Sequence, residues 1–279
     1  MDPPLHRNNH WFCSAKDECA HLVMGHAITP PPQIPRVQID KIHSEVPKME
    51  EVRATSAWVA SHSSHVTVDS SGIEKVAERM KDSIPKVEWD FEGIHYFDNG
   101  PLTVGFELER SFDGKASKLV ESCEKSAAKL VALITSHFPG FRDHTVYKGH
   151  QVFLYKRAQI FAADLWGAFK GQGYGEFNDI ESVTMFADYI VPAVLEQLGV
   201  LKFSPSLSNI IDSNREISSG SEEEVELRAC SVHAVEEIRE QIHRKTGKQV
   251  LSVELDLWLW AFGVKCSSLQ HHRTLSIYY

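Results

Sequence analysis

The sequence predicts a mainly α-helical protein with few or no β-strands, folded as a single helical domain over residues 51–279. About seven segments place apolar residues at helical spacing, and each is close to the usual three-turn helix length. The strand–helix alternation that is typical of a parallel sheet is missing from the pattern. With 42% hydrophobic and 24% charged residues, the composition is that of an ordinary globular domain.

Residues 1–50 lack this helical periodicity, and we expect them to be poorly ordered. The run ITPPPQIPRV contains prolines that favour extended backbone over helix. Several metal-binding residue types precede it, but their spacing matches no usual zinc motif, so no metal site is predicted. These residues are His10, Cys13, Cys19, His21 and His26.

The first predicted helices come directly after this segment. Periodicity begins near Val52, in the run VRATSAWVASHSSHVTV, which predicts a first helix. A break at Ser71-Gly72 separates it from a second amphipathic helix that reaches Met80. The segment Ser117–Phe138 predicts a longer helix, which the Pro-Gly pair at 139–140 ends.

The middle of the chain alternates predicted helices with short breaks. Val152–Phe169 is predicted to be helical and is closed by the glycine-rich run GQGYG. Asp179–Ala187 predicts a short helix leading to Asp188. Pro192 suits the first turn of a further helix that ends at Gly199. Asp188 should therefore lie near helix N-terminal N–H groups, which stabilise its ionised form.

The last third of the chain opens with a strong helix-start signal. Ser221 and Glu224 form an S-x-x-E capping box that begins a long helix ending at Gly247. The acids at 222–224 complement the helix dipole, so stability alone explains them. The segment Leu251–Phe262 matches both an alternating strand pattern and a helical pattern, and both interpretations stay open here.

Charge and composition exclude several classes of function. The formal charge of −9 argues against a nucleic-acid-binding surface, because affinity for DNA or RNA depends on neutralising many phosphates. A small anionic ligand held by one or two local cations remains compatible with it. There is no run of roughly 18 apolar residues to predict a membrane span, and the N-terminus lacks a secretory pattern. The five scattered cysteines suit a reducing compartment, so we expect a cytoplasmic protein.

The stretch 152–192 places charged residues among apolar and aromatic neighbours. Charged side chains are rarely fully buried unless they are paired or functional. A carboxylate in such a setting has a pKa that its surroundings can adjust for chemistry. Composition alone favours the alternative, in which these groups form structural ion pairs inside a helical core. The residues concerned are Lys156, Arg157, Asp164, Asp179 and Asp188.

Four motifs in this chain resemble the queuosine salvage protein family. They are KRAQIFAADLW at 156–166, SVTMFADYIVP at 182–192, GSEEEVELRACS at 220–231 and the closing HHRT and IYY, and the short run LGVL at 198–201 agrees with them. Members of that family are queuosine 5′-phosphate N-glycosidases, which separate the modified base queuine from ribose 5-phosphate and return it for tRNA modification. The resemblance implies a mainly helical fold similar to that of DNA glycosylases. It also implies a small-molecule substrate (queuosine 5′-phosphate, with queuine as product), no direct binding of nucleic acid, and neither a metal nor another cofactor.

The resemblance also implies roles for particular residues. Asp188, in MFADY, matches the catalytic aspartate of the family, and Lys156, at the start of KRAQ, matches a lysine that acts with it. Three residues match positions that contact the base or its cyclopentenediol arm, and these are Phe186, His95 and Asp256. Two further candidates for substrate binding are Leu257, next to Asp256, and Asp164, inside the first motif.

The chemistry of N-glycoside cleavage agrees with these roles. Positive charge develops on the ribose, and a fixed carboxylate stabilises this oxocarbenium-like state. The same carboxylate can act as nucleophile or can activate water, and both routes stay open. A nearby lysine keeps the carboxylate ionised, attracts the phosphate or protonates the leaving base. Phe186 can stack on the purine-like ring, and Asp256 or Asp164 suits the secondary amine of queuine.

Structural explanations stand beside these roles. Asp164 could pair with Arg157 seven residues earlier on the same helix. Asp256 could belong to the polar face of an amphipathic helix. His272 and Arg273 could satisfy backbone carbonyls near the C-terminus rather than bind phosphate.

The chain departs from the family pattern at Val104. The family continues there into a strongly apolar segment with an LDALNFCFW-like motif, whereas this chain runs directly into Gly105–Arg110. The sequence therefore predicts that an internal block, about the size of a small subdomain, is missing near 104/105. Its loss would leave apolar faces uncovered and part of the base pocket unbuilt. The alternative function is a catalytically inactive shortened form that binds queuine weakly or has no enzymatic role.

Overall fold

The computed structural model describes residues 49–82, 102–266 and 268–279. Helices dominate these residues, which confirms the mainly α-helical prediction. Strands are limited to two short antiparallel pairs within the same residues. Within these ranges, no helix has both the length and the apolar character needed to cross a membrane. The predicted order of residues 1–50 and the candidate residue His95 lie outside the described residues, apart from Met49 and Glu50, which begin the first helix.

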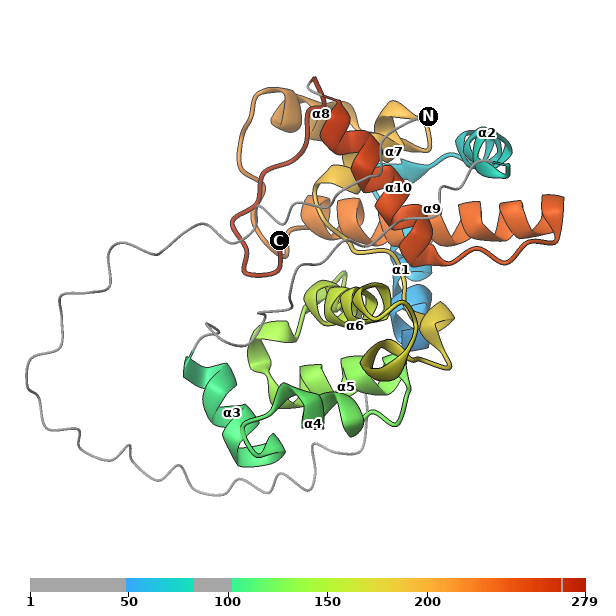
Figure 1. The fold of residues 1–279 in the computed structure, drawn as a ribbon. Coiled ribbons are helices and arrows are strands. Elements are labelled where there is room, and N and C mark those ends of the chain that lie inside the picture. Colours follow the sequence, from blue (N-terminus) through green and yellow to red (C-terminus); the bar gives the residue numbers. More distant parts are fainter. Residues whose placement is uncertain (1–48, 83–101, 267) are drawn as a thin grey trace, which may run out of the picture.

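The α-helices fall into two groups (Figure 1). The first group surrounds the long helix α9, and its other members are α1, α2, α7, α8 and α10. The second group contains α3 to α6, with α5 packed on α6. The bounds are α1 Met49–His62, α2 Ser70–Met80, α3 Leu102–Phe112, α4 Ala116–Glu121, α5 Ala127–His137, α6 Lys156–Ala168, α7 Ile190–Gln197, α8 Pro205–Asp212, α9 Glu222–Thr246 and α10 Ser252–Lys265.

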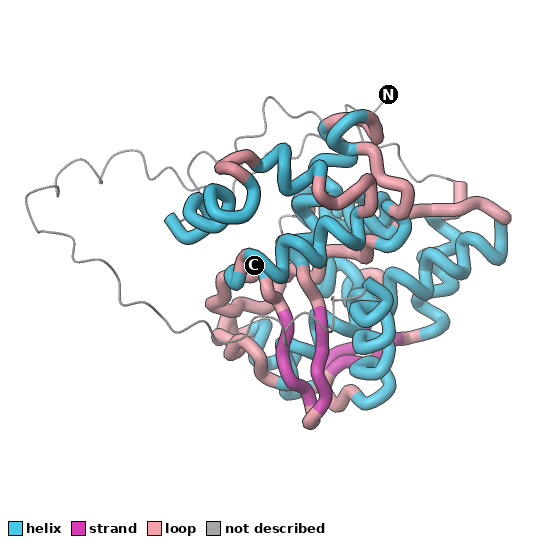
Figure 2. The backbone as a smooth tube through the Cα atoms, turned by 90° about the horizontal axis from the view of Figure 1, so that it is seen from below, coloured by secondary structure: helices cyan, strands magenta, loops and turns pink. Residues whose placement is uncertain are grey.

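The strands form two short pairs among these helices (Figure 2). β1 (Val66–Val68) pairs with β4 (Leu201–Phe203), so that the turn after α1 is joined to the chain after α7. β2 (His144–Tyr147) and β3 (His150–Phe153) form a hairpin between α5 and α6. This hairpin packs against α1 and α9, and it carries the start of α6 towards the first group.

α9 is the central element because its first half, from Glu224 to Val232, is buried on all sides and its second half buries one apolar face. α1 and α2 pack along one part of it, and α7 and α10 pack on another. The predicted helix ends are present: the Ser221 hydroxyl accepts from the Glu224 amide, and Gly247 ends the helix at a φ of 69°. The predicted capping box is only half formed, because the Glu224 carboxylate accepts from the Gly220 amide and the Ser221 amide donates to the Ser218 carbonyl. Such a left-handed residue is the usual way for a helix to end, and glycine adopts it without steric cost.

Several other sequence predictions are confirmed. α1 and α7 form where periodicity and turn residues place them, and α7 ends just before Gly199. The second amphipathic helix is present as α2 and reaches Met80, but the predicted break at Ser71-Gly72 is wrong: α2 begins at Ser70 and contains both residues, because the Asp69 carboxylate caps it by accepting from the Gly72 amide. The ambiguous segment Leu251–Phe262 is helical in α10. The first predicted run is helical only as far as His62, since Val66–Val68 is the strand β1.

The helix predicted over Ser117–Phe138 is wrong as a single element. The chain forms α4 and α5, and Glu124 and Lys125 between them have φ values of 53° and 64°. Asp179 explains the break, because its carboxylate accepts from the Ser126 hydroxyl and from the first amides of α5. A side chain distant in sequence therefore fixes the N-terminus of α5, and local periodicity does not reveal it.

Two further boundaries are corrected. Residues 152–155 are not helical, because Val152 and Phe153 belong to β3 and the helix starts only at Lys156. The segment Asp179–Ala187 contains a single 3₁₀ turn and has no other regular secondary structure. Its amides bind side chains of other helices: the Thr184 amide donates to Gln159 and the Phe186 amide to Asp256. These long-range acceptors replace the helical carbonyls that the sequence pattern suggested.

A close approach at Gly72 gives a test of this packing. A Cβ at Gly72 would lie 2.1 Å from the Gly199 carbonyl oxygen, so Gly72→Ala forces α2 away from the end of α7. We expect a loss of about 1–3 kcal/mol in the free energy of unfolding, as for an overpacked core. In Gly105→Ala the new Cβ meets no atom within 4 Å, and better helix propensity should stabilise the protein by up to about 1 kcal/mol. Urea denaturation measures both, and equal effects would contradict the packing.

Candidate active site

The non-helical segment Val183–Asp188 lies between α6 and α10 and is held by buried side chains of both helices. From α6, Gln159 Oε1 accepts from the amide and the hydroxyl of Thr184, at 2.8 and 3.1 Å. From α10, Asp256 Oδ1 accepts from the Phe186 amide at 2.9 Å. The structure therefore joins Phe186 and Asp256, two residues that the sequence assigned to the same ligand. Leu257 is buried beside Asp256 on α10.

Asp188 lies at the start of α7, as the sequence predicted. Its Oδ1 accepts from the amides of Ile190 and Val191, both at 2.9 Å. These N–H groups have no partner inside the helix, and the positive end of the helix dipole stabilises an anion there. The side chain is only 6% exposed, so these amides replace much of the hydration of the carboxylate.

Lys156 is the first residue of α6 and is also buried. Its ammonium lies 5.6 Å from the centre of the Tyr279 ring. The preceding residue, Tyr155, has left-handed backbone dihedrals of φ 49° and ψ 34°, which is uncommon for a bulky residue. The position of Lys156 thus depends on a backbone conformation that the surrounding structure must enforce.

A buried ion pair, formed by Asp143 and Arg228, lies between Asp188 and Lys156. Arg228 on α9 binds both oxygens of Asp143, at 2.9 and 2.5 Å, and its Nε donates to the Ala187 carbonyl at 2.9 Å. Burial lowers the pKa of Arg228, but the Asp143 and Glu224 carboxylates raise it more, so the guanidinium remains charged. Asp143 Oδ2 also accepts from the Lys156 amide at 3.0 Å.

Tyr279 brings the C-terminal segment to the same cluster. The guanidinium carbon of Arg228 lies 5.2 Å from the centre of the Tyr279 ring. The Tyr279 hydroxyl contacts both Glu224 Oε1 and His272 Nε2 at 2.9 Å. An ionised carboxylate can only accept, so the hydroxyl donates to Glu224 and accepts from His272. Burial, with the nearby charges of Arg228 and His271, lowers the pKa of His272 to about 3. His272 is therefore neutral near pH 7 and carries its proton on Nε2.

Asp164 and Arg157 are not the structural pair that was considered. Asp164 is buried on α6. Arg157 is directed to the C-terminal segment, where it donates to the Ile277 carbonyl at 3.1 Å and lies 4.9 Å from the Phe141 ring. His272 binds the Tyr279 hydroxyl rather than a carbonyl, which corrects the structural explanation considered for it.

The comparisons with known proteins decide the family. The family model described as queuosine salvage protein matches residues 51–279. The chain belongs to the queuosine salvage protein family. Three curated relatives are each named queuosine 5′-phosphate N-glycosylase/hydrolase. That of Dictyostelium discoideum is 47% identical over 63% of this chain and 55% of its own length.

The other two relatives agree with it. The protein of Sphaerobacter thermophilus is 41% identical over 63% of this chain and 54% of its own length. The protein of Bos taurus is 39% identical over 62% of this chain and 54% of its own length. This member of the family therefore spans about half the length of the curated relatives that it matches.

Sequence reasoning missed the residues that support the family motifs. Asp143, Arg228, Gln159 and Tyr279 were not singled out, and Glu224 was assigned only to the helix cap and the helix dipole. Glu224 is buried and lies 3.3 Å from Arg228, one helical turn away. Glu224 and Arg228, which lie four residues apart at the start of the apolar stretch that follows, are the one local signal that could have indicated a buried pair.

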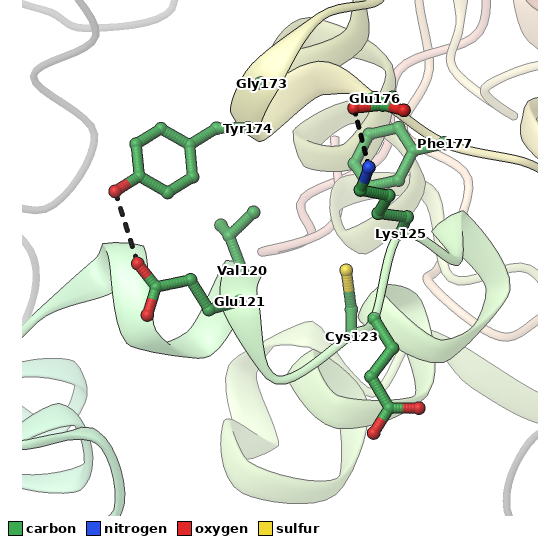
Figure 3. A pocket seen from close by; sticks show the side chains of 9 residues that line it. Val120, Glu121, Cys123, Lys125, Gly173, Tyr174, Glu176 and Phe177 are labelled. Carbon is green, nitrogen blue, oxygen red and sulfur yellow. Dashed lines mark hydrogen bonds and ion pairs between the residues drawn. The ribbon is translucent and has the colours of Figure 1, made fainter.

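A separate cavity lies outside this site. It has a volume of about 390 Å³ and lies between the α4–α5 junction and the turn Gly173–Gly175 (Figure 3). Lys125 and Glu176 line the cavity and form an ion pair of 2.9 Å. Cys123 also lines it. Burial raises the pKa of Cys123, so its thiol is not an activated nucleophile. None of the predicted site residues lines this cavity.

A cluster of His65, Glu222 and Glu226 has the spacing of metal ligands. However, Glu226 already accepts four hydrogen bonds, from the amides of residues 64–66 and from the Tyr147 hydroxyl. These donors occupy both of its oxygens, so its chemistry is that of a structural anchor for the turn after α1.

The neutral state of His272 predicts a pH dependence of stability. Its pKa is about 3 in the folded protein against 6.5 for the free side chain. Between pH 6.5 and 3, His272 is therefore protonated in the unfolded chain but neutral in the folded protein. The free energy of unfolding then falls as the pH falls towards 3. His272→Gln can still donate to Tyr279 but does not titrate. Between pH 6.5 and 5, wild type should lose on the order of 1–2 kcal/mol more than the variant in urea denaturation. Parallel pH profiles would contradict this assignment.

Proposed function

We propose that this chain hydrolyses the N-glycosidic bond of queuosine 5′-phosphate and releases queuine for salvage into tRNA modification. The observation that carries the proposal is the buried Asp188 carboxylate, oriented at the N-terminus of α7 and two residues after Phe186. Membership of the queuosine salvage family supports it, as do the relatives named for this reaction. We further propose a cytoplasmic protein that acts on the small molecule and not directly on nucleic acid, since its formal charge is −9.

In this proposal Asp188 stabilises the positive charge that develops on the ribose as the bond to the base breaks. Two amides fix its Oδ1, so the carboxylate need not reorganise during the reaction. Water supplies hydroxide to the anomeric carbon, directly or after attack by Asp188, and its remaining proton balances the departing base. Lys156 supplies a buried positive charge that favours the ionised carboxylate and the anionic substrate.

The base side of the proposed site is the 183–188 segment together with α10. Phe186 offers an aromatic ring for the deazapurine, and Asp256 holds the Phe186 amide. The Asp256 carboxylate also suits the cationic amine of queuine, with Leu257 beside it. Asp164 and His95 remain candidates for the same ligand, and His95 lies outside the described residues.

We also propose that the chain lacks an internal block at 104/105 that its longer relatives have. Its half-length coverage of those relatives supports this. Val104 and Gly105 lie inside the continuous helix α3, whose inner residues Leu108 and Phe112 are buried. On the same helix Phe106 is 69% exposed, as expected where an apolar covering element is missing.

A substitution that keeps the helix cap tests the role of Asp188. Asp188→Asn retains an oxygen that can accept from the α7 amides but removes the charge. We expect single-turnover release of queuine to fall by at least about 100-fold. Asp69→Asn is the matched control, because Asp69 caps α2 by accepting from Gly72, away from the site. It should keep the wild-type rate.

The same assay distinguishes the inactive alternative. If folded, monodisperse wild-type protein releases no queuine from queuosine 5′-phosphate, this form is not a hydrolase. Retention of most of the rate by Asp188→Asn would instead refute the role of that carboxylate.

Asp256 should act on binding more than on the chemical step. Asp256→Asn keeps an acceptor for the Phe186 amide but removes the charge that faces the cationic arm. We expect KM to rise by about 10-fold or more with kcat little changed, as when a charged hydrogen bond to substrate is lost. Steady-state kinetics with queuosine 5′-phosphate measures this, and an equal loss in kcat would assign Asp256 to the chemistry.

A further inference from the structure

We propose that Asp143 and Arg228 form a positioning pair that sets the place of Lys156 relative to Asp188. This inference rests on the proposed hydrolysis and adds two residues to it. Neither side chain needs to touch substrate, because the pair acts through backbone groups next to the two reacting residues. Three observations carry it: the contacts of Asp143 with the start of α6, those of Arg228 with the residue before Asp188, and the burial of the pair.

Asp143 holds the chain that leads into Lys156. Its backbone carbonyl accepts from the amides of Leu154 and Tyr155, at 3.0 and 2.9 Å, and its side chain accepts from the Lys156 amide at 3.0 Å. A single residue thus binds successive amides on both sides of the left-handed Tyr155. A conformation of this kind costs about 1–3 kcal/mol and persists only where the surroundings enforce it. Asp143 provides that enforcement, and the direction of α6 from Lys156 onwards depends on it.

Arg228 carries the same constraint to Asp188. Two of its nitrogens bind Asp143, and its Nε donates to the carbonyl of Ala187, directly before Asp188. The guanidinium is planar, so its contacts with Asp143 and Ala187 cannot be adjusted independently. The positions of the Asp188 carboxylate at α7 and of the Lys156 ammonium at α6 therefore both depend on one rigid group, the Arg228 guanidinium on α9.

Burial makes this linkage stiff. The side chains of Arg228 and Asp143 are 4% and 2% exposed, so neither can exchange its partner for water. Glu224 adds a second acceptor to Arg228 at 3.3 Å and is itself fixed by Tyr279. Misplacement of catalytic groups by about 1 Å is enough to reduce a rate by on the order of 100-fold. A small change in this pair is therefore expected to affect catalysis more than substrate binding.

The principal test is Arg228→Lys, which keeps a buried cation but cannot bind Asp143 with two nitrogens and Ala187 with a third. We expect kcat for queuosine 5′-phosphate to fall on the order of 10- to 100-fold with KM nearly unchanged. Asp143→Asn should give the same split between kcat and KM, and it serves if Arg228→Lys does not fold. An unchanged kcat in either folded variant would overturn the proposal.

Glu226→Gln is the matched control. Glu226 is a buried carboxylate on the same helix that also binds successive amides, but at the turn after α1. Its loss should lower the denaturation midpoint while the folded protein keeps the wild-type kcat. If Glu226→Gln lowered kcat as much as Arg228→Lys, the effect would be one of general destabilisation, and the positioning role would be refuted.

Amide hydrogen exchange tests the linkage without relying on activity. In Arg228→Lys, faster exchange should appear together at residues 154–156 and at the α7 amides 190–191, whereas Glu226→Gln should affect neither. A change in only one of the two segments would overturn the idea that a single pair positions both. Absence of hydrolysis by wild type would refute the proposed function, and the exchange result would still decide whether the pair couples the two segments.

Discussion

The structure depends on the requirement that charges buried on α9 be fully compensated. Arg228 and Glu226 lie two positions apart on this helix, and both are almost completely buried. An unpaired charge at either place would cost about 3–5 kcal/mol, a large fraction of the stability of a domain. The chain meets this requirement at the two ends of β2, where Asp143 binds Arg228 and the Tyr147 hydroxyl binds Glu226. One strand thereby fixes the hairpin, the start of α6 and the turn after α1 to the same helix.

This arrangement explains why similar carboxylates have different roles. Asp69, Asp179 and Asp188 each accept amides at the start of a helix. Asp69 is partly open to solvent and is held by Lys202, and Asp179 closes the break before α5. Asp188 alone among the three follows a segment whose amides and carbonyl are held by α6, α9 and α10. Helix capping is therefore common to all three, and the surroundings of Asp188 are what suit it to chemistry.

The sequence predicted the parts of the fold that local rules determine. Ser221, Gly247 and Gly199 marked helix ends correctly because capping depends on residues only a few positions apart. The errors at Ser117–Phe138, at 152–155 and at Asp179–Ala187 have a common cause. In each case a side chain or backbone group distant in sequence binds the amides that a continued helix would have used. No periodicity within a segment contains that information.

In the candidate site, too, the sequence predicted what local motifs contain and missed what depends on contacts distant in sequence. The motifs named Asp188, Lys156, Phe186 and Asp256, and the structure joins Phe186 to Asp256 directly. The pair that connects Lys156 to Asp188 was not predicted, because Asp143 and Arg228 are separated by 85 positions and have no spacing rule.

This connection bears on the proposed loss of an internal block. The elements that hold the proposed reacting pair, from β2 to the C-terminal Tyr279, all follow Gly105 and form one buried network. A block missing at 104/105 would therefore remove covering and base-contacting surface while leaving the geometry of the carboxylate and the lysine intact. Hydrolysis by this form then depends on whether the 183–188 segment and α10 alone can hold the base for one turnover.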